Sequence, residues 1–181
     1  MAPRGLTIRA SVPLHESASM TELTPEYFRK ACGYWATGVS IVTTRDVDQT
    51  PYGLTMNAIT SLSLTPALFI VCVDNKSDTL EPMKRSGVFC INVLSAGQQD
   101  LSNNFSKKSP NKFEGVGFER GSTGSPMLDG RLMAIDCQVT AVHPGGDHHI
   151  FVGEVRAVTF PDSDAIEPLL YYRGRYTGVL S

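Results

Sequence analysis

The 181-residue sequence predicts a mainly β fold, an antiparallel barrel or curled sheet that carries a few short helices. Stretches typical of strands outnumber those typical of helices by about two to one. The two longest, over 132–143 and 148–160, are joined by the turn PGGD and predict an antiparallel hairpin. No series of alternating β and α units is present, which argues against a parallel Rossmann sheet. Closure into a barrel would remove exposed sheet edges.

The composition is that of a single globular domain. Hydrophobic residues make up 41% of the chain and charged residues 19%, as in soluble proteins of ordinary size. The net charge of −2 offers no basic surface for nucleic acid or for an anionic membrane. The longest apolar runs, such as PALFIVCV, fall far short of the roughly 20 residues that cross a bilayer. We expect a flexible arm over 1–22, without the apolar segment of a secretory signal, and one domain over 23–181.

The four cysteines predict reduced thiols in the core of a cytoplasmic protein. Each lies in an apolar run, and none belongs to a CxxC pair or stands at zinc spacing from a histidine: Cys32, Cys72, Cys90 and Cys137. Free thiols of this kind are typical of reducing compartments. A metal pair made by His143 and His149 across the PGGD turn lacks a third ligand, so we expect no metal site.

The first predicted element is a helix that begins after Thr24. Thr24 suits the N-cap position, and Pro25 suits the first helical position, where its missing N–H costs nothing. Apolar side chains at helical spacing continue to Trp35, and Gly38 supplies an end for the helix. A strand over 39–45 is expected to follow directly.

Three further strands are predicted in the first half of the chain. After a turn-rich connection over 46–53, residues 54–64 form an extended segment rich in threonine, isoleucine and serine. Residues 67–73 are a continuous apolar run, which predicts a strand covered on both faces. Residues 88–94 have the same character.

Two short helices and one long loop are predicted between the later strands. Residues 75–87 begin with capping residues and end in glycine, and Leu80 and Met83 should face inward. Residues 95–106 begin with serine and carry glutamine three positions later, the pattern of a capping box. Residues 106–130 are dense in glycine, serine, proline and lysine and predict a long ordered loop, a kind that is usually functional.

The usual nucleotide-binding fingerprints are absent. The chain has no GxGxxG after a strand, no GxxxxGK[ST], no GxSxG and no HExxH. A phosphate would have to be held by hydroxyls, backbone N–H groups and single cations. Such groups crowd 55–63, and Asn75, Lys76, Ser77 and Asp78 open a predicted helix, whose N-terminus would favour an anion. The simpler alternative is that Ser77 only caps its helix and the strand hydroxyls satisfy one another.

Seven stretches, in this order, resemble the short-chain flavin reductases of two-component monooxygenases: WATGVSIVTT, YGLTMNAITSLSL, FIVCVDNKSDTL, FCINVLS, GSPMLDG, CQVTAVHPGGDHHIFVGEV and PLLYYRGRY. The resemblance runs from about Phe28 to the C-terminus. It implies a split β-barrel of the FMN-binding type, an antiparallel Greek-key barrel, and a homodimer. It also implies that NADH reduces FAD or FMN, and that the reduced flavin passes to a separate oxygenase, commonly one acting on phenols or other aromatics.

The resemblance further implies which residues bind the flavin. Those expected at the isoalloxazine and ribityl groups are Thr37, Gly38, Thr55, Met56, Asn57 and Ala58. Those expected at the phosphate end are Ser61, Lys76 and Ser77. Cys72 should pack near the flavin, and Phe105 should stack or lean against the site. Such a site must hold the nicotinamide C4 close to the flavin N5.

Adjacent histidines begin the strand after the PGGD turn. Because successive strand side chains point to opposite faces, His148 and His149 cannot easily serve one site. Gly146-Asp147-His148 resembles the family's nicotinamide motif, so His148 is the expected catalytic residue, at the nicotinamide or as a proton donor. The alternative is a histidine that only completes a hairpin turn.

The C-terminal tyrosines admit two interpretations. Tyr171 and Tyr176, with Arg173 and Arg175, would cradle a pyridine nucleotide by stacking and a phosphate contact. Equally, they would lie in a dimer interface, where tyrosine and arginine are enriched.

The chain departs from the family pattern at two places. Leu64-Thr65-Pro66-Ala67 replaces a more usual Asp-Pro-Pro sequence, and Asn103 to Lys108 is unusually polar and basic. Lys107 and Lys108 would either hold the extra phosphate that FAD carries or solvate the end of a helix. The choice between FAD and FMN therefore stays open, and the sequence slightly favours FAD. Alternatives are a reductase with tightly bound flavin that serves another acceptor, such as a corrinoid, and a non-catalytic flavin- or heme-binding barrel.

Overall fold

The main body of the molecule is one curled antiparallel sheet of seven strands. The computed structural model describes residues 22–161 and 166–179, so the predicted arm lies outside these ranges except for its last residue. The strand order is β3-β2-β6-β9-β10-β5-β4, and every neighbouring pair is antiparallel. The prediction of a mainly β, antiparallel fold is confirmed.

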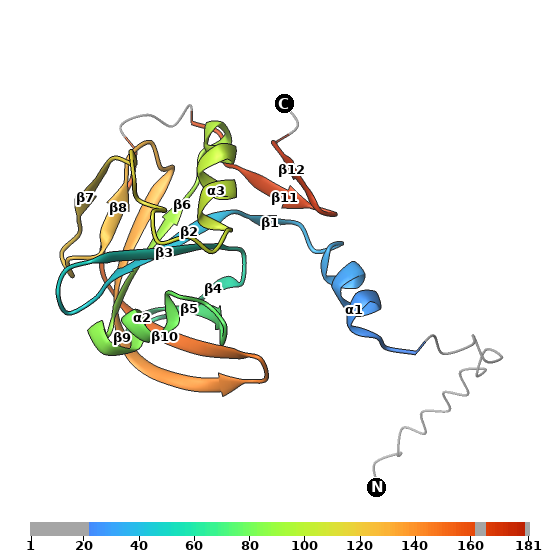
Figure 1. Cartoon of the computed structure of the whole chain (residues 1–181), viewed down its shortest axis with the longest axis horizontal. Coiled ribbons are helices and arrows are strands. Elements are labelled where there is room, and N and C mark those ends of the chain that lie inside the picture. Colours follow the sequence, from blue (N-terminus) through green and yellow to red (C-terminus); the bar gives the residue numbers. More distant parts are fainter. Residues whose placement is uncertain (1–21, 162–165, 180–181) are drawn as a thin grey trace, which may run out of the picture.

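The strands of this sheet have the following bounds: β2 Ser40–Arg45, β3 Pro51–Met56, β4 Ile59–Leu64, β5 Ala67–Asp74, β6 Val88–Val93, β9 Met133–Gly145 and β10 His148–Thr159. The two edge strands, β3 and β4, are consecutive in the chain and are separated only by Asn57 and Ala58. The sheet curls until these edges meet at one corner, but they do not pair with each other. The result is a split barrel (Figure 1).

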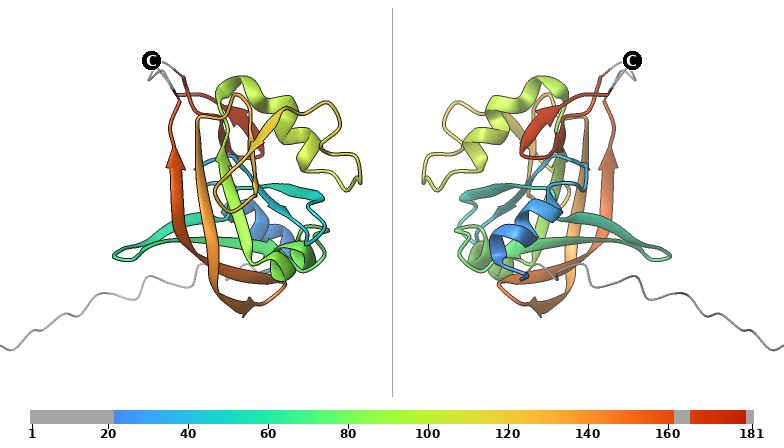
Figure 2. Two further views of the ribbon diagram at one scale, coloured as in Figure 1. Left: turned by 90° about the vertical axis from the view of Figure 1, so that its left-hand side faces the viewer. Right: turned by 90° about the vertical axis from the view of Figure 1, so that its right-hand side faces the viewer.

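Two small sheets and the helices cover the ends of the barrel. β1 Thr37–Gly38, β11 Leu170–Tyr172 and β12 Arg175–Thr177 form one small sheet, and β7 Phe118–Arg120 pairs with β8 Pro126–Leu128. α2 Leu80–Ser86 closes one end, and α3 Gln99–Phe105 with the 3-10 turn Ala96–Gln98 lies at the other (Figures 1 and 2). The capping box is confirmed, because the backbone N–H of Ser95 donates to Gln98 Oε1 at 3.1 Å.

The first helix, α1 Pro25–Cys32, is shorter than predicted. Thr24 caps it as expected, accepting from the Tyr27 N–H at 3.2 Å. The helix ends at Gly33 rather than Gly38, because the chain turns there to pair Thr37 with Tyr171. None of the residues of α1 is buried, and Trp35, which was expected on its apolar face, lies beyond the helix and is 79% exposed.

Several other boundaries differ from the sequence prediction for tertiary reasons. The extended segment 54–64 is two strands, and β3 begins at Pro51, inside the expected turn. β5 is not covered on both faces: Val71 and Val73 are buried, whereas Cys72 on the opposite face is half-buried. The predicted loop 106–130 contains the β7–β8 hairpin, and α2 begins at Leu80 rather than near residue 75.

The core consists of two clusters. The larger fills the barrel and includes Val42, Met83, Phe89, Ile135 and Phe151, while the smaller lies under α3 and includes Leu94 and Leu128. Leu80 and Met83 face inward as predicted. Of the four cysteines, Cys90 and Cys137 are buried and Cys72 is half-buried, but Cys32 is exposed, as are its neighbours on α1, which has no buried residue. The prediction of four core thiols is therefore wrong for Cys32.

The long connection after α3 is held to the barrel by buried polar groups. Asp136 accepts hydrogen bonds from Ser122 Oγ at 2.8 Å and from the Thr123 N–H at 2.7 Å. Asn92 Oδ1 accepts from the Leu128 N–H at 2.7 Å. Because unsatisfied buried polar groups are costly, these bonds fix the β7–β8 hairpin against the sheet.

At Gly153, β10 packs tightly on the interior of the barrel. A Cβ placed on Gly153 would lie 2.4 Å from the Phe89 ring and 2.9 Å from Cys137 Cβ. We predict that Gly153→Ala lowers the free energy of unfolding by about 1–3 kcal/mol through overpacking. Gly97→Ala, at a position with nothing within 4 Å of the added Cβ, is the matched control. Urea unfolding should separate the two, and equal midpoints would contradict this account of the core.

Candidate functional site

The chain crosses from one sheet edge to the other at Asn57 and Ala58, which we call the corner. The Ala58 carbonyl accepts from the Cys72 N–H at 3.0 Å, and the Asn57 side-chain amide donates to Thr37 Oγ1 at 3.1 Å. These two bonds tie the corner to β5 on one side and to the small C-terminal sheet on the other. Residues from distant parts of the chain thus meet at the split of the barrel.

Two cavities open at the corner and share Asn57. The corner cavity, of about 630 Å³, lies between α1, the corner and β5, and its lining residues are Phe28, Ala31, Cys32, Trp35, Thr37, Asn57, Ala58, Ile59, Thr60, Ile70 and Cys72. The tail cavity, of about 390 Å³, is lined by Val39, Thr55, Met56, Asn57, Ser102, Asn103, Ser106, Tyr171, Gly174 and Tyr176. Predicted site residues from four separate segments of the chain therefore line these two cavities.

The C-terminal tyrosines are brought to the predicted 55–58 segment. Tyr176 Oη lies 2.9 Å from Ser102 Oγ and donates to Asn103 Oδ1 at 3.1 Å. The rings of Tyr171 and Tyr176 pack edge to face, with centroids 5.4 Å apart. Their hydroxyl and ring contacts fix one wall of the tail cavity.

Strand register places the two histidines on opposite faces. Ile150 lies opposite Cys72, so His148, two residues earlier on β10, shares the face that carries Cys72 and Ile70 of the corner cavity. His149 instead shares the face of the buried Phe151. The His143–His149 metal pair is excluded, because His143 lies opposite Ile150 and so shares its face rather than that of His149.

Each histidine has one fixed partner. His148 Nδ1 lies 2.7 Å from Asp147 Oδ1, and this hydrogen bond and charge lower the pKa of Asp147. His149 Nδ1 lies 2.6 Å from Asn75 Oδ1. The Asn75 backbone N–H also donates to the Asp147 carbonyl at 3.0 Å, so the end of β5 holds the turn before His148 in place.

The predicted anion site at Lys76 and Ser77 is not a helix terminus. α2 begins at Leu80, and Ser77 Oγ accepts from the Thr79 N–H at 3.2 Å in the preceding turn. Asp74 holds this turn by accepting from the Lys76 N–H at 2.7 Å. The two residues thus lie beside the Asp147 turn, without the helix-dipole contribution that the sequence predicted, and Ser77 does not cap the helix.

Phe105, Ser61 and Gly38 are three further residues that were predicted at the flavin. Phe105 is 1% exposed, and its ring packs on Gly53 and Phe113 in the core, so its contact with the flavin, by stacking or by leaning against the site, stays a prediction. Ser61 lies on the opposite face of β4 from Thr60, which lines the corner cavity, and its contact with a phosphate stays a prediction. Gly38 pairs with Leu170 beside the corner.

Cys72 forms part of the floor of the corner cavity. Burial raises the pKa of its thiol, so the side chain stays protonated and apolar at neutral pH. Among the described residues, no group of three His, Cys, Asp or Glu side chains is arranged to hold a metal. The same part of the chain has no helix long and apolar enough to span a bilayer.

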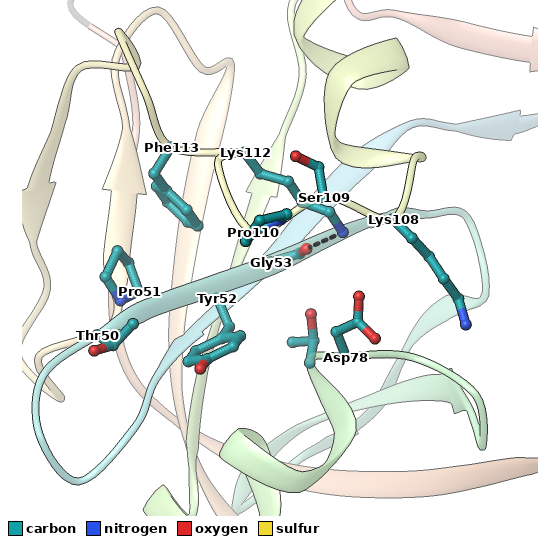
Figure 3. Close-up of a pocket in the computed structure, with 11 residues that line it drawn as sticks. Thr50, Pro51, Tyr52, Gly53, Asp78, Lys108, Ser109, Pro110, Lys112 and Phe113 are labelled. Atoms are coloured by element: carbon teal, nitrogen blue, oxygen red, sulfur yellow. Dashed lines mark hydrogen bonds between the residues drawn. The ribbon is translucent and has the colours of Figure 1, made fainter.

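The sequence did not predict several lining positions, and Trp35 and Lys112 show why. Trp35 was expected on the buried face of a helix, and only the early end of α1 places it in the wall of the corner cavity. Lys112, in the predicted loop, lines a third cavity beside β3 (Figure 3). No periodic pattern in the sequence marks Lys112, since its position depends on how the loop folds back.

Known proteins share this architecture. A family model described as flavin reductase like domain matches residues 32–180. The flavin-dependent monooxygenase reductase subunit HsaB of Mycobacterium tuberculosis is 38% identical over 158 residues, which cover 87% of this chain and 84% of that protein. Nitrilotriacetate monooxygenase component B from Mycobacterium thermoresistibile superposes with a TM-score of 0.82 at 38% identity, over 86% of each chain.

A third relative was solved with nucleotides. The NADH:FAD oxidoreductase SgcE6 of Streptomyces globisporus, in complex with NAD and FAD fragments, superposes with a TM-score of 0.77 at 32% identity, covering 83% of this chain and 89% of that one. The family match covers residues 32–180, a range that includes the barrel, the corner and the C-terminal strands. The chain therefore belongs to the flavin reductase family.

Proposed function

We propose that this protein is an NADH-dependent flavin reductase that supplies reduced flavin to a separate monooxygenase, one that acts on an aromatic compound. The observation that carries the proposal is the corner, where an open cavity built from strand and turn atoms lies on the same sheet face as His148. Family membership and the printed names of the relatives, which include reductase subunits and an NADH:FAD oxidoreductase, support it.

The flavin, when bound, supplies the acceptor for the hydride of NADH, and the protein supplies position. We assign the isoalloxazine to the corner, with Asn57 and Ala58 at its polar edge and Cys72 beneath it. Asn57 carries both donor and acceptor groups, and a backbone corner presents fixed dipoles toward developing charge. The protonated Cys72 offers an apolar surface rather than a nucleophile. Thr37 positions Asn57 through their 3.1 Å hydrogen bond.

We assign the nicotinamide to the side of His148. The Asp147 carboxylate accepts from Nδ1, which leaves Nε2 as the ring atom that is available to a ligand. Asn75 positions this turn through its contacts with Asp147 and His149. In this arrangement His148 orients the nicotinamide toward the flavin, and in its protonated form it would donate a proton.

A homodimer is the assembly that the exposed apolar surface supports. α1 has no buried residue and stands apart from the sheet in Figure 1, while the β4–β5 hairpin extends beyond the body in Figure 2. Trp35 is 79% exposed, and Leu64 at the end of β4 is 93% exposed. Exposed large apolar side chains of this kind mark an interaction site, and a second copy would cover them.

The domain bounds and the cellular location are part of the same proposal. We take residues 23–181 as one reductase domain and the cytoplasm as its location. NADH is a cytoplasmic reductant, and the four cysteines are free thiols.

The function is tested by the oxidation of NADH with FAD, FMN and riboflavin in turn, without a partner protein. We expect NADH consumption that depends on added flavin and a protein that is colourless after desalting. The absence of consumption with any flavin would overturn the proposal. A protein that keeps its flavin through desalting would contradict the proposal that reduced flavin is released and diffuses to a separate monooxygenase.

His148→Ala should separate the two ligands. We predict that kcat/KM for NADH falls roughly tenfold or more because the nicotinamide loses its orientation. Flavin affinity, measured by fluorescence titration, should stay within error of the wild type. His143→Ala is the matched control, since His143 is an exposed histidine on the neighbouring strand β9. An equal loss of flavin affinity in His148→Ala would place this histidine at the flavin instead.

Trp35→Glu should break the proposed dimer. A charge in an apolar interface is costly when it is desolvated, so sedimentation should shift from dimer to monomer. Val47→Glu places the same charge on an exposed valine in the β2–β3 turn, far from α1 in Figure 1, and should remain dimeric. A wild-type protein that sediments as a monomer would contradict the proposal directly.

A further inference from the structure

One wall of the corner cavity is formed by α1 and by the residues that follow it. Phe28, Ala31 and Cys32 of α1 line the cavity, and Trp35 lines it from just beyond the helix. We call these four residues the helix wall. None of the residues of α1 is buried, and the helix stands apart from the sheet in Figure 1. The position of the helix wall therefore depends on how the chain is attached at its C-terminal end.

The C-terminal hairpin of β11 and β12 holds the chain on both sides of Trp35. The backbone N–H of Arg173 donates to the Gly33 carbonyl at 2.8 Å, where α1 ends. Thr37, at the start of β1, pairs with Tyr171 of β11. Trp35 lies midway between these two attachments. The hairpin thus fixes the backbone that carries Trp35 into the cavity.

The side chain of Arg173 makes a further contact with this segment. Its guanidinium carbon lies 4.7 Å from the centroid of the Tyr34 ring. Tyr172 packs edge to face against the same ring, with centroids 6.5 Å apart. A guanidinium over an aromatic face is favourable even at an exposed site. The hairpin therefore holds the residue before Trp35 by its side chain as well.

The backbone conformation of Arg173 is unusual for an arginine. Arg173 and Gly174 are the two residues between β11 and β12, and their φ angles are +50° and +78°. Two-residue hairpin turns with positive φ at both positions favour asparagine, aspartate or glycine at the first of them. A larger side chain is disfavoured there because of its Cβ. The turn therefore does not account for the arginine, whereas the contact with Tyr34 does.

A direct contact with a pyridine nucleotide is the alternative role for Arg173. Its guanidinium, however, lies over the Tyr34 ring. Arg173 is not among the described residues that line the corner cavity or the tail cavity. An effect of Arg173 on a ligand in the corner cavity would therefore be transmitted through the helix wall.

We propose that Arg173 is a positioning residue for the flavin, which holds the helix wall at the corner cavity through its contact with Tyr34. The proposal rests on the proposed reductase function, in which the isoalloxazine occupies this cavity. Apparent affinity falls when a smaller fraction of the protein has its binding site assembled. Because His148 and Asn57 orient the reacting rings, Arg173 would affect the affinity for flavin and leave hydride transfer at saturation unchanged.

Arg173→Gly removes the side chain and keeps the turn, because glycine readily adopts a positive φ and retains the N–H that donates to Gly33. The KM for flavin should rise roughly threefold, the scale of an exposed cation–π contact. The rise should be equal for FAD, FMN and riboflavin, which share the ring, while kcat and the KM for NADH stay unchanged. Arg29→Ala, which removes an exposed arginine from α1, is the matched control. A rise in the KM for NADH alone would assign Arg173 to the pyridine nucleotide and overturn the proposal.

Variants of Tyr34 test whether its ring is the partner of Arg173. Tyr34→Leu removes the ring and should raise the KM for flavin as Arg173→Gly does. The double variant should show no further rise, because both changes remove the same contact. Tyr34→Phe keeps the ring and should behave as the wild type. Equal losses in Tyr34→Phe and Tyr34→Leu would contradict the proposed contact.

Trp35 reports on the helix wall without turnover, because it is the only tryptophan in the chain. Without ligands, its fluorescence anisotropy should decay faster in Arg173→Gly than in the wild type or Arg29→Ala. Quenching of Trp35 by added flavin should give a dissociation constant roughly threefold higher in Arg173→Gly. The variant should also sediment as the wild type does, and a change of assembly would place Arg173 at a subunit contact and overturn the proposal.

The two proposals can fail separately. Unchanged anisotropy and an unchanged dissociation constant, in a protein that still reduces flavin, would reject the role of Arg173 and leave the reductase function intact. A wild type that reduces no flavin would overturn the reductase function, and the anisotropy of Arg173→Gly would still decide whether Arg173 holds the helix wall.

Discussion

The structure depends on a barrel that curls shut without pairing its last two edges. β3 and β4 follow one another in the chain, and a two-residue link would ordinarily make them a hairpin. Here Asn57 donates to Thr37, and Ala58 accepts from the N–H of Cys72, so the link bonds outward to other elements. Each strand is left at a different edge of the same sheet. The cavities open where the edges fail to close, and for this reason the site lies at the split.

An unpaired sheet edge can pair with the strands of other chains, and the two edges of this sheet are protected differently. The β3 edge is covered by α3 and by the connection that brings Lys112 onto the Gly53 carbonyl. The β4 edge is bordered by exposed apolar side chains, including Leu64, which a second copy would cover. The first edge thus faces a polar, cationic cavity, while the second faces an apolar surface. That asymmetry leaves the apolar β4 side for the proposed protein contact.

The sequence was sufficient wherever a feature depends on near neighbours. The Thr24 cap, the Ser95–Gln98 capping box and the β9–β10 hairpin could all be predicted, because each depends on local backbone chemistry. The burial of Phe105 was not readable, because it depends on Gly53, a contact between α3 and β3 that no local pattern encodes. Trp35 has helical spacing, but the pairing of Thr37 with Tyr171 ends the helix first. The flavin residues came from family resemblance, since hydroxyls on strands do not identify a ligand by themselves.

A reductase that releases its product needs a site held by geometry more than by affinity. The corner provides fixed backbone dipoles and an apolar thiol, and the cavities beside it are open to solvent. Such a site can align two rings, because alignment depends on rigid strands, and it can still release one of them, because few strong contacts must break.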